Sequence, residues 1–76
     1  SVSINIKSVE SNIAKDLTRI QKKFLKKVDI GSYPFFRLGV IGVAIVLRSS
    51  SKIQLNLCKK SIIKMIKIKK IILLKV

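Results

Sequence analysis

Residues 1–24 read SVSINIKSVESNIAKDLTRIQKKF, and the spacing of their apolar side chains changes along this stretch. In the first seven residues, apolar and polar side chains alternate, which predicts a half-buried strand: Val2, Ile4 and Ile6 are the apolar positions. Farther along, apolar residues fall at i, i+4, i+7 and i+11, one stripe of an amphipathic helix: Ile13, Leu17, Ile20 and Phe24. Ser11 or Asn12 can supply the N-cap oxygen of that helix. A strand followed by a helix is therefore expected.

A second strand is predicted where Val28 and Ile30 alternate with polar residues. We expect it to end at Gly31, Ser32, Tyr33 and Pro34, because a proline cannot donate a ladder hydrogen bond and restricts the residue before it. The chain should bend or leave the sheet there. Residues 35–39 would then be a hairpin connection, with Gly39 at or near the turn.

Residues 40–47 form a nearly continuous apolar run rich in Val and Ile, which favours a strand buried on both faces. After a break at residues 49–51, Ser51 and Gln54 fit a capping box that opens a second helix. Its apolar stripe consists of Leu55, Cys58, Ile62 and either Met65 or Ile66. We interpret Cys58 as core packing rather than as a reactive thiol.

Beyond Met65 the pattern could change to alternation at Ile66 and Ile68, with a last strand ending in residues 71–74. The order is then β-α-β-β-α with a possible final β. This order predicts an α+β fold, a small split βαβ (ferredoxin-like) sandwich with two helices on one face of the sheet.

The composition excludes several classes of function. The chain has 76 residues, a net charge of +14, no His and a single Cys, so a Ser-His-Asp or Cys-His catalytic group cannot be built and ligands for a metal site are too few. We expect no catalytic residue, no metal and no cofactor. One cysteine cannot form an internal disulfide, and the first residues lack the pattern of a signal peptide, so a cytoplasmic location is expected.

The strongly basic character leaves alternatives open. A small module that binds nucleic acid or an anionic membrane surface is one, and drift in an A+T-rich genome, which over-supplies Ile and Lys, is the other. The segment 39–42 matches the GxxG loop of KH domains, but its two middle residues belong to the apolar run, where burial is expected. No Phe or Tyr is expected to alternate with basic residues in a stacking pattern.

Three segments carry a family resemblance: residues 11–21 (SNIAKDLTRIQ), 28–34 (VDIGSYP) and 43–49 (VAIVLRS). Together they resemble the C-terminal part of molybdopterin-binding-like (MoaB/Mog-type) domains of the competence/damage-inducible protein A family, which also occur fused to FAD synthases. Glu10 stands where that family has a leading Glu. The resemblance covers roughly residues 8–60, so residues 1–60 are assigned to this subdomain and residues 61–76 to a Lys/Ile-rich helix end and tail.

The resemblance implies that this chain is a truncated, non-catalytic subdomain. The complete protein would bind a pterin or nucleotide-like small molecule through an upstream α/β region. That N-terminal half, or a second copy of the chain, is the expected partner.

The family's GSYP segment, Gly31, Ser32, Tyr33 and Pro34, is the candidate site. Ser32 or Tyr33 could contact a ligand or partner, although a fixed bend that ends a strand is the favoured interpretation. The three acidic residues, Glu10, Asp16 and Asp29, are spaced so that they fall on different elements. Ion pairing with nearby lysines is expected for them rather than acid–base chemistry.

Overall fold

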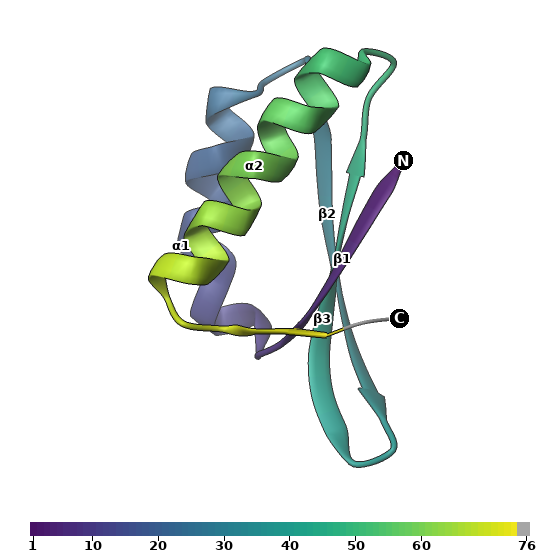
Figure 1. Ribbon diagram of the computed structural model, residues 1–76, viewed down its shortest axis with the longest axis vertical. Helices are drawn as coiled ribbons and strands as arrows, with labels where there is room; N and C mark the ends of the chain where they lie inside the picture. The colour runs from purple at the N-terminus through teal and green to yellow at the C-terminus, as the bar shows by residue number, and fades with distance from the viewer. Residues whose placement is uncertain (75–76) are drawn as a thin grey trace.

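The chain folds in the order strand, helix, strand, strand, helix, strand, with both helices on one side of the sheet (Figure 1). A computed structural model describes residues 1–74. The elements are β1 (Val2–Lys7), α1 (Glu10–Lys23), β2 (Asp29–Arg37), β3 (Val40–Arg48), α2 (Lys52–Ile68) and β4 (Ile72–Leu74). This order confirms the predicted α+β split βαβ, ferredoxin-like sandwich, and it includes the final strand.

The four strands form one antiparallel sheet in the order β2-β3-β1-β4. In its centre, Ile4 lies opposite Ile45 and Ile6 lies opposite Val43. Side chains that face each other across two strands point to the same side of a sheet, so these four residues share the side covered by the helices. We call the other side, which no helix covers, the open face.

The hydrophobic core lies between the helices and the sheet, and each of the two helices contributes an apolar stripe to it. Its buried members are Ile4, Ile6, Ile13, Ile20, Phe24, Val28, Val43, Ile45, Leu47, Cys58, Ile62, Met65 and Ile66. The stripe predicted for the first helix is therefore confirmed, apart from Leu17, which is only partly buried. Cys58 is fully buried, as predicted, and its burial raises the pKa of the thiol.

The N-cap predicted for the first helix is wrong, whereas that of the second is confirmed. Helix α1 begins at Glu10, its N-cap residue is Val9, and no side chain caps it. The Asn12 side chain donates to Ser8 Oγ (3.1 Å) instead. In α2, Ser51 Oγ accepts from the backbone N–H of Gln54 (3.3 Å).

Only half of the predicted capping box of α2 is formed. The backbone N–H of Ser51 donates to Ser49 Oγ (3.1 Å), so it is not held by the Gln54 side chain. Ser49 Oγ in turn donates to the carbonyl of Lys27 (2.6 Å). The serine run therefore ties the start of α2 to the connection after α1.

Strand β2 runs straight through the segment where a bend was expected. Pro34 lies opposite Val43 in the ladder, and pairing continues to Arg37 opposite Val40. The predicted strand end at residues 31–34 and the predicted connection at residues 35–39 are therefore wrong. The physical reason is that β2 is an edge strand, where one side of the backbone has no ladder partner and proline is tolerated.

The hairpin turn consists of Leu38 and Gly39 alone. Both have positive φ, 50° and 77°, as a two-residue type I′ turn requires. The placement of Gly39 at the turn is confirmed.

Strand β3 is buried on one side rather than on both. Val43, Ile45 and Leu47 are buried under the helices, whereas Ala44 and Val46 on the open face are only half-buried. A continuous apolar run was expected to need two covered faces. Here aromatic side chains of the neighbouring β2 cover part of the second face, as described below.

Helix α2 runs across residue 60 and continues to Ile68, so the predicted alternation at Ile66 and Ile68 is wrong. The helix is followed by β4, which pairs with β1. The division of the chain at residue 60 stays a prediction from composition.

Two isoleucines of α2 test whether its second half belongs to the cooperative unit. Ile62→Val removes a methylene from a fully buried side chain, and we expect it to lower the free energy of unfolding by about 0.5–1.5 kcal/mol. Ile68→Val makes the same change at a side chain that is 70% exposed, and we expect a change below about 0.5 kcal/mol. Urea unfolding followed by circular dichroism measures both free energies. If Ile62→Val changed the free energy of unfolding as little as Ile68→Val does, residues after 60 would lie outside the folded unit.

Candidate functional site

The four residues of the GSYP segment do not form one site, because they alternate between the two sides of β2. Ser32 and Pro34 lie opposite Ile45 and Val43, on the helix-covered side. Gly31 and Tyr33 are on the open face. The segment therefore contributes to two surfaces that have to be considered separately.

On the helix-covered side, Ser32 contacts the leading Glu of α1. Ser32 Oγ donates to Glu10 Oε2 (3.0 Å), which joins the edge strand to the first turn of the helix. A groove of about 360 Å³ runs between the two elements; it is lined by Glu10, Ala14, Leu17, Thr18, Gln21, Lys22, Ile30 and Ser32. Its only acid is already held by Ser32.

The other end of this groove is fixed by Gln21. Its Nε2 donates to the carbonyl of Val28 (2.8 Å), and its Oε1 accepts from the backbone N–H of Ile30 (2.9 Å). The Gln21 amide thus makes the two hydrogen bonds that a neighbouring strand would make at the outer edge of β2, where no other strand pairs. On this side, the contacts of the segment stabilise the packing of β2 on α1.

On the open face, two aromatic rings lie over glycines. A Cβ atom on Gly31 would lie 3.0 Å from Cε2 of Tyr33, and one on Gly42 would lie 2.4 Å from Cζ of Phe35. The rings therefore lean onto the sheet at positions without side chains. The guanidinium of Arg37 lies over the Phe35 ring, 4.8 Å from its centroid.

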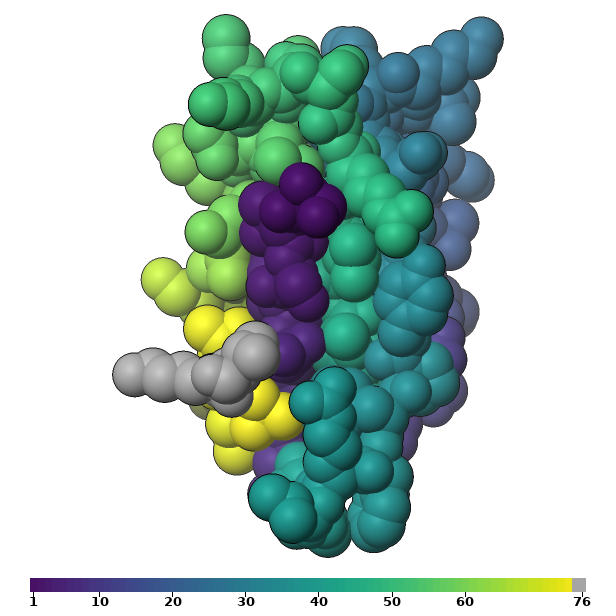
Figure 2. All heavy atoms as spheres, turned by 90° about the vertical axis from the view of Figure 1, so that its right-hand side faces the viewer, coloured from purple at the N-terminus to yellow at the C-terminus, as the bar shows by residue number. Residues whose placement is uncertain are grey.

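Figure 2 shows this face, with β1 in purple between β4 in yellow and the teal strands β2 and β3. Tyr33, Phe35 and Arg37 follow one another along β2 at every second residue, so they share the face. Two aromatic residues and one arginine thus share this face without alternating, an arrangement that was hidden by placing the end of the strand at Pro34.

The hairpin at the end of β2 and β3 forms a third surface. Figure 1 shows that it extends past the ends of both helices. Phe36 is 69% exposed, Ile41 is 55% exposed, and Leu38 at the turn is fully exposed. We call these three residues the hairpin patch. The GxxG segment 39–42 lies in this hairpin and not between two helices, so it does not form a KH loop.

The sequence matches the family described as FAD synthase, middle domain, over residues 1–75. The chain belongs to this family. No curated protein and no solved structure gives a significant match. The relation to FAD synthases expected from the resemblance is confirmed, whereas the assignment to molybdopterin-binding-like (MoaB/Mog-type) domains stays a prediction.

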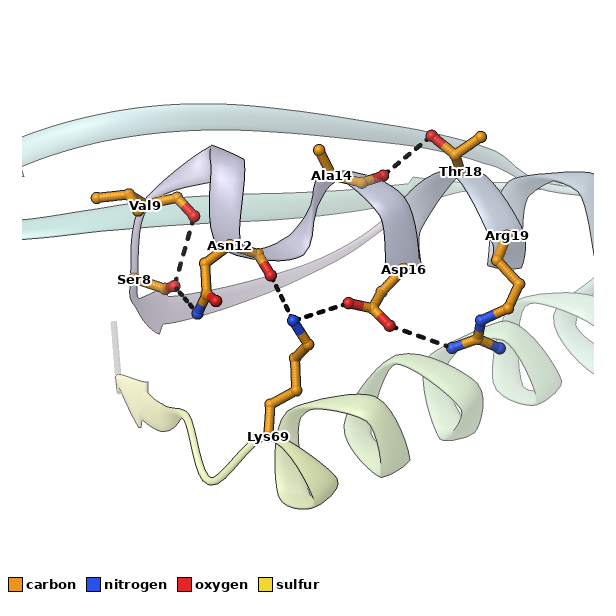
Figure 3. A network of polar contacts seen from close by, with 8 residues as sticks. All are labelled: Ser8, Val9, Asn12, Ala14, Asp16, Thr18, Arg19 and Lys69. Carbon is orange, nitrogen blue, oxygen red and sulfur yellow. Dashed lines mark hydrogen bonds and ion pairs between the residues drawn. The ribbon is translucent and has the colours of Figure 1, made fainter.

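Glu10 and Asp16 both lie on α1 and Asp29 lies on β2, so the expectation that the three acids fall on different elements is wrong for the first two. Asp16 has the ion pairs expected from the sequence. Figure 3 shows Lys69, which follows α2, reaching back to α1. Its Nζ lies 3.0 Å from Asp16 Oδ2 and donates to the carbonyl of Asn12, while Arg19 lies 3.5 Å from Asp16 Oδ1. The hydrogen bond from Lys69 is the main reason why the pKa of Asp16 is lowered.

Neither a metal-binding cluster nor a membrane-spanning helix is found among residues 1–74. No group of three or more His, Cys, Asp or Glu side chains there is placed to hold a metal ion. None of the helices in that range is both long enough and apolar enough to span a bilayer.

The Lys69 contact can be tested through the titration of Asp16. Because its folded pKa lies below the ordinary 3.8, the carboxylate stabilises the fold above that value, and the stabilisation is lost as the pH falls through the folded pKa. We expect Asp16→Asn to lower the free energy of unfolding at neutral pH by about 0.2–1 kcal/mol, since the pair is partly exposed to solvent. The difference between the two proteins should vanish in acid.

The cause is checked by NMR titration of the Asp16 carboxyl carbon. In Lys69→Met the pKa should rise toward 3.8. In Lys67→Met, which removes the same charge two residues earlier in the chain, it should change much less. Equal shifts in both variants would show that general charge, and not the hydrogen bond, lowers the pKa.

Proposed function

We propose that this middle domain is a non-catalytic connecting domain of an FAD synthase-related protein, and that it packs its hairpin patch against a neighbouring domain of that protein. The observation that carries the proposal is Leu38. It is fully exposed and has a φ of 50°, a backbone conformation that a branched apolar residue adopts only at a cost of about 1–2 kcal/mol. Asn, Asp or Gly would be preferred there.

The chemistry of the described residues supports a non-catalytic role. The chain has three acidic residues and no His. Glu10 is engaged by Ser32, and Asp16 by Lys69 and Arg19. These partners are suited to stabilising the packing of the elements, because each joins α1 to another element or to its own next turn. The Ser32 hydroxyl beside Glu10 has no His to activate it, since the chain has none.

The hairpin patch has the properties of a surface that another domain covers. Phe36 and Ile41 lie opposite each other in the ladder, on the side that the helices cover farther up the sheet. Because the hairpin extends past the helices (Figure 1), these side chains have no helix above them. Covering large apolar side chains gains roughly 1.5–3 kcal/mol for each one fully buried, which offsets the strain at Leu38.

The occupant is inferred from the family and from the resemblance. A middle domain of FAD synthase, by its description, has sequence on both sides of it. The resemblance points to the upstream α/β region, the N-terminal half of the molybdopterin-binding-like domain, as the neighbour, and through it to a complete protein that binds a pterin or nucleotide-like small molecule. A second copy of the chain is the other occupant to be tested. The cytoplasmic location expected from the lone cysteine belongs to this proposal.

Leu38→Asn separates stability from docking. In the 76-residue chain we expect it to raise the free energy of unfolding by about 1 kcal/mol, because Asn adopts positive φ at lower cost. In the complete protein it should instead speed amide hydrogen exchange in the hairpin, which the neighbouring domain otherwise protects. Leu25→Asn, at an exposed leucine after α1, is the control and should leave hairpin exchange unchanged.

Three results would overturn the proposal. Equal hairpin exchange in the chain alone and in the complete protein would show that nothing covers the patch. Formation of FAD from FMN and ATP by the chain alone would show that it is catalytic. Concentration-dependent dimerisation of the chain, abolished by Leu38→Asn, would replace the neighbouring domain by a second copy.

A further inference from the structure

We propose that the open face of the sheet binds single-stranded nucleic acid by stacking unpaired bases on Tyr33 and on the Phe35–Arg37 pair. This inference is independent of the proposed connecting role, because it uses the other side of β2. The hairpin patch residue Phe36 points to the helix-covered side, while Tyr33 and Phe35 point to the open face.

The first argument is the orientation of the two rings. A ring that stands upright on a sheet shows its edge to solvent, and a ring that leans onto the sheet shows one flat side. Tyr33 leans over Gly31, and Phe35 crosses to Gly42 on β3, where a Cβ atom would also come within 2.8 Å of the carbonyl oxygen of Ile6. At both glycines, the ring lies in the space that a side chain would otherwise occupy.

The second argument is what remains exposed above the rings. Tyr33 is 53% exposed. Phe35 is half-buried, and the guanidinium carbon of Arg37 lies over its ring. Aromatic rings and arginine planes are the groups on which proteins stack unpaired bases, at about 1–3 kcal/mol per base. Residues two apart along a strand are about 7 Å apart, so each platform has room for one splayed base.

The third argument is charge. Beside Arg37, the open face carries Arg48 at the end of β3 and Lys7 at the end of β1, and its one acid is Asp29, opposite Arg48. The whole chain has a net charge of +14. A polyanion is therefore drawn to the domain, and on this face its phosphates find cations next to stacking platforms.

A groove supports the placement of a base beside Tyr33. It has a volume of about 230 Å³ and lies between Tyr33 and the start of β2, lined by Asp29, Ile30, Gly31, Tyr33, Val46 and Arg48. Its carboxylate and guanidinium are a hydrogen-bond acceptor and a donor for the polar edge of a base. A single unpaired base offers a free face to Tyr33, whereas the base faces of a duplex are already stacked.

The sequence provides a direct probe, because Tyr33 is the only Tyr and the chain has no Trp. Intrinsic fluorescence therefore reports on this face alone. A single-stranded 12-nucleotide RNA of mixed sequence should quench the emission of the full chain, and N-acetyltyrosinamide titrated in parallel corrects for light absorbed by the RNA. The same RNA annealed into a duplex should quench far less.

Variants then identify the platform by fluorescence anisotropy of a labelled copy of the same RNA. Tyr33→Leu should weaken binding by about 5- to 100-fold, the range expected for loss of one stacked base. Tyr33→Phe keeps the ring and should restore affinity to within a few-fold. Phe36→Leu is the matched control. Phe36 is an exposed aromatic residue on the opposite face of β2, and this variant should bind the RNA like the original chain.

Four results would overturn the inference. Equal affinity for single strand and duplex, with no effect of Tyr33→Leu, would mean that the lysines bind any polyanion. No binding at moderate salt would exclude the role. If Tyr33→Leu left RNA binding unchanged but exposed the open face to hydrogen exchange in the complete protein, the face would be a protein-docking surface instead. Vesicles of anionic lipid that quench Tyr33 as well as RNA does would point to a membrane surface.

Discussion

The structure depends on one constraint: two helices cover only one side of a four-stranded sheet. Side chains alternate along each strand, so the pairing of Ile4 with Ile45 and of Ile6 with Val43 decides which half of every strand is buried. A slip of one residue would place Ser3 and Asn5 in the core. Because this register is held by the apolar stripes of both helices, the residues of the open face are fixed as a consequence, including the three that follow one another along β2.

Sequence periodicity predicted the parts of the fold that are determined locally. The stripe of α1, the Ser51 cap and the buried Cys58 all follow from spacing within a few residues. The continuation of β2 past Pro34 could not be predicted in this way, because proline is tolerated there only at the edge of the sheet, and edge position is a property of the whole topology. The start of α1 was placed too late for a related reason. Its N-cap residue is Val9, whose side chain makes no capping hydrogen bond, and no residue type in the sequence indicates such a cap.

The candidate site was found only in part for the same reason. Glu10 and the GSYP segment were both singled out, but their contact joins residues 22 positions apart and depends on how α1 lies along β2. Tyr33, Phe35 and Arg37 form a period-two pattern that is visible in the sequence. It was missed because the strand was ended at residues 31–34 instead of at Arg37. An error in an element boundary therefore removes a surface as well as a few residues of strand.

The features that distinguish the two proposed surfaces all weaken the fold. Leu38 is strained and leaves an apolar side chain in water, and Gly31 and Gly42 occupy strand positions where a side chain would stabilise the sheet. Rings lying over the glycines restore part of that loss. At Gly31, where a Cβ atom would meet only the Tyr33 side chain, a β-branched residue would do so without leaving Tyr33 exposed, whereas Gly42 is also required by the carbonyl oxygen of Ile6. A 76-residue domain has a small core, so it can offset only a limited loss of stability. Their presence at one hairpin and on one sheet face is accounted for when both surfaces make contacts outside this domain, with a protein at the hairpin and with unpaired bases on the sheet.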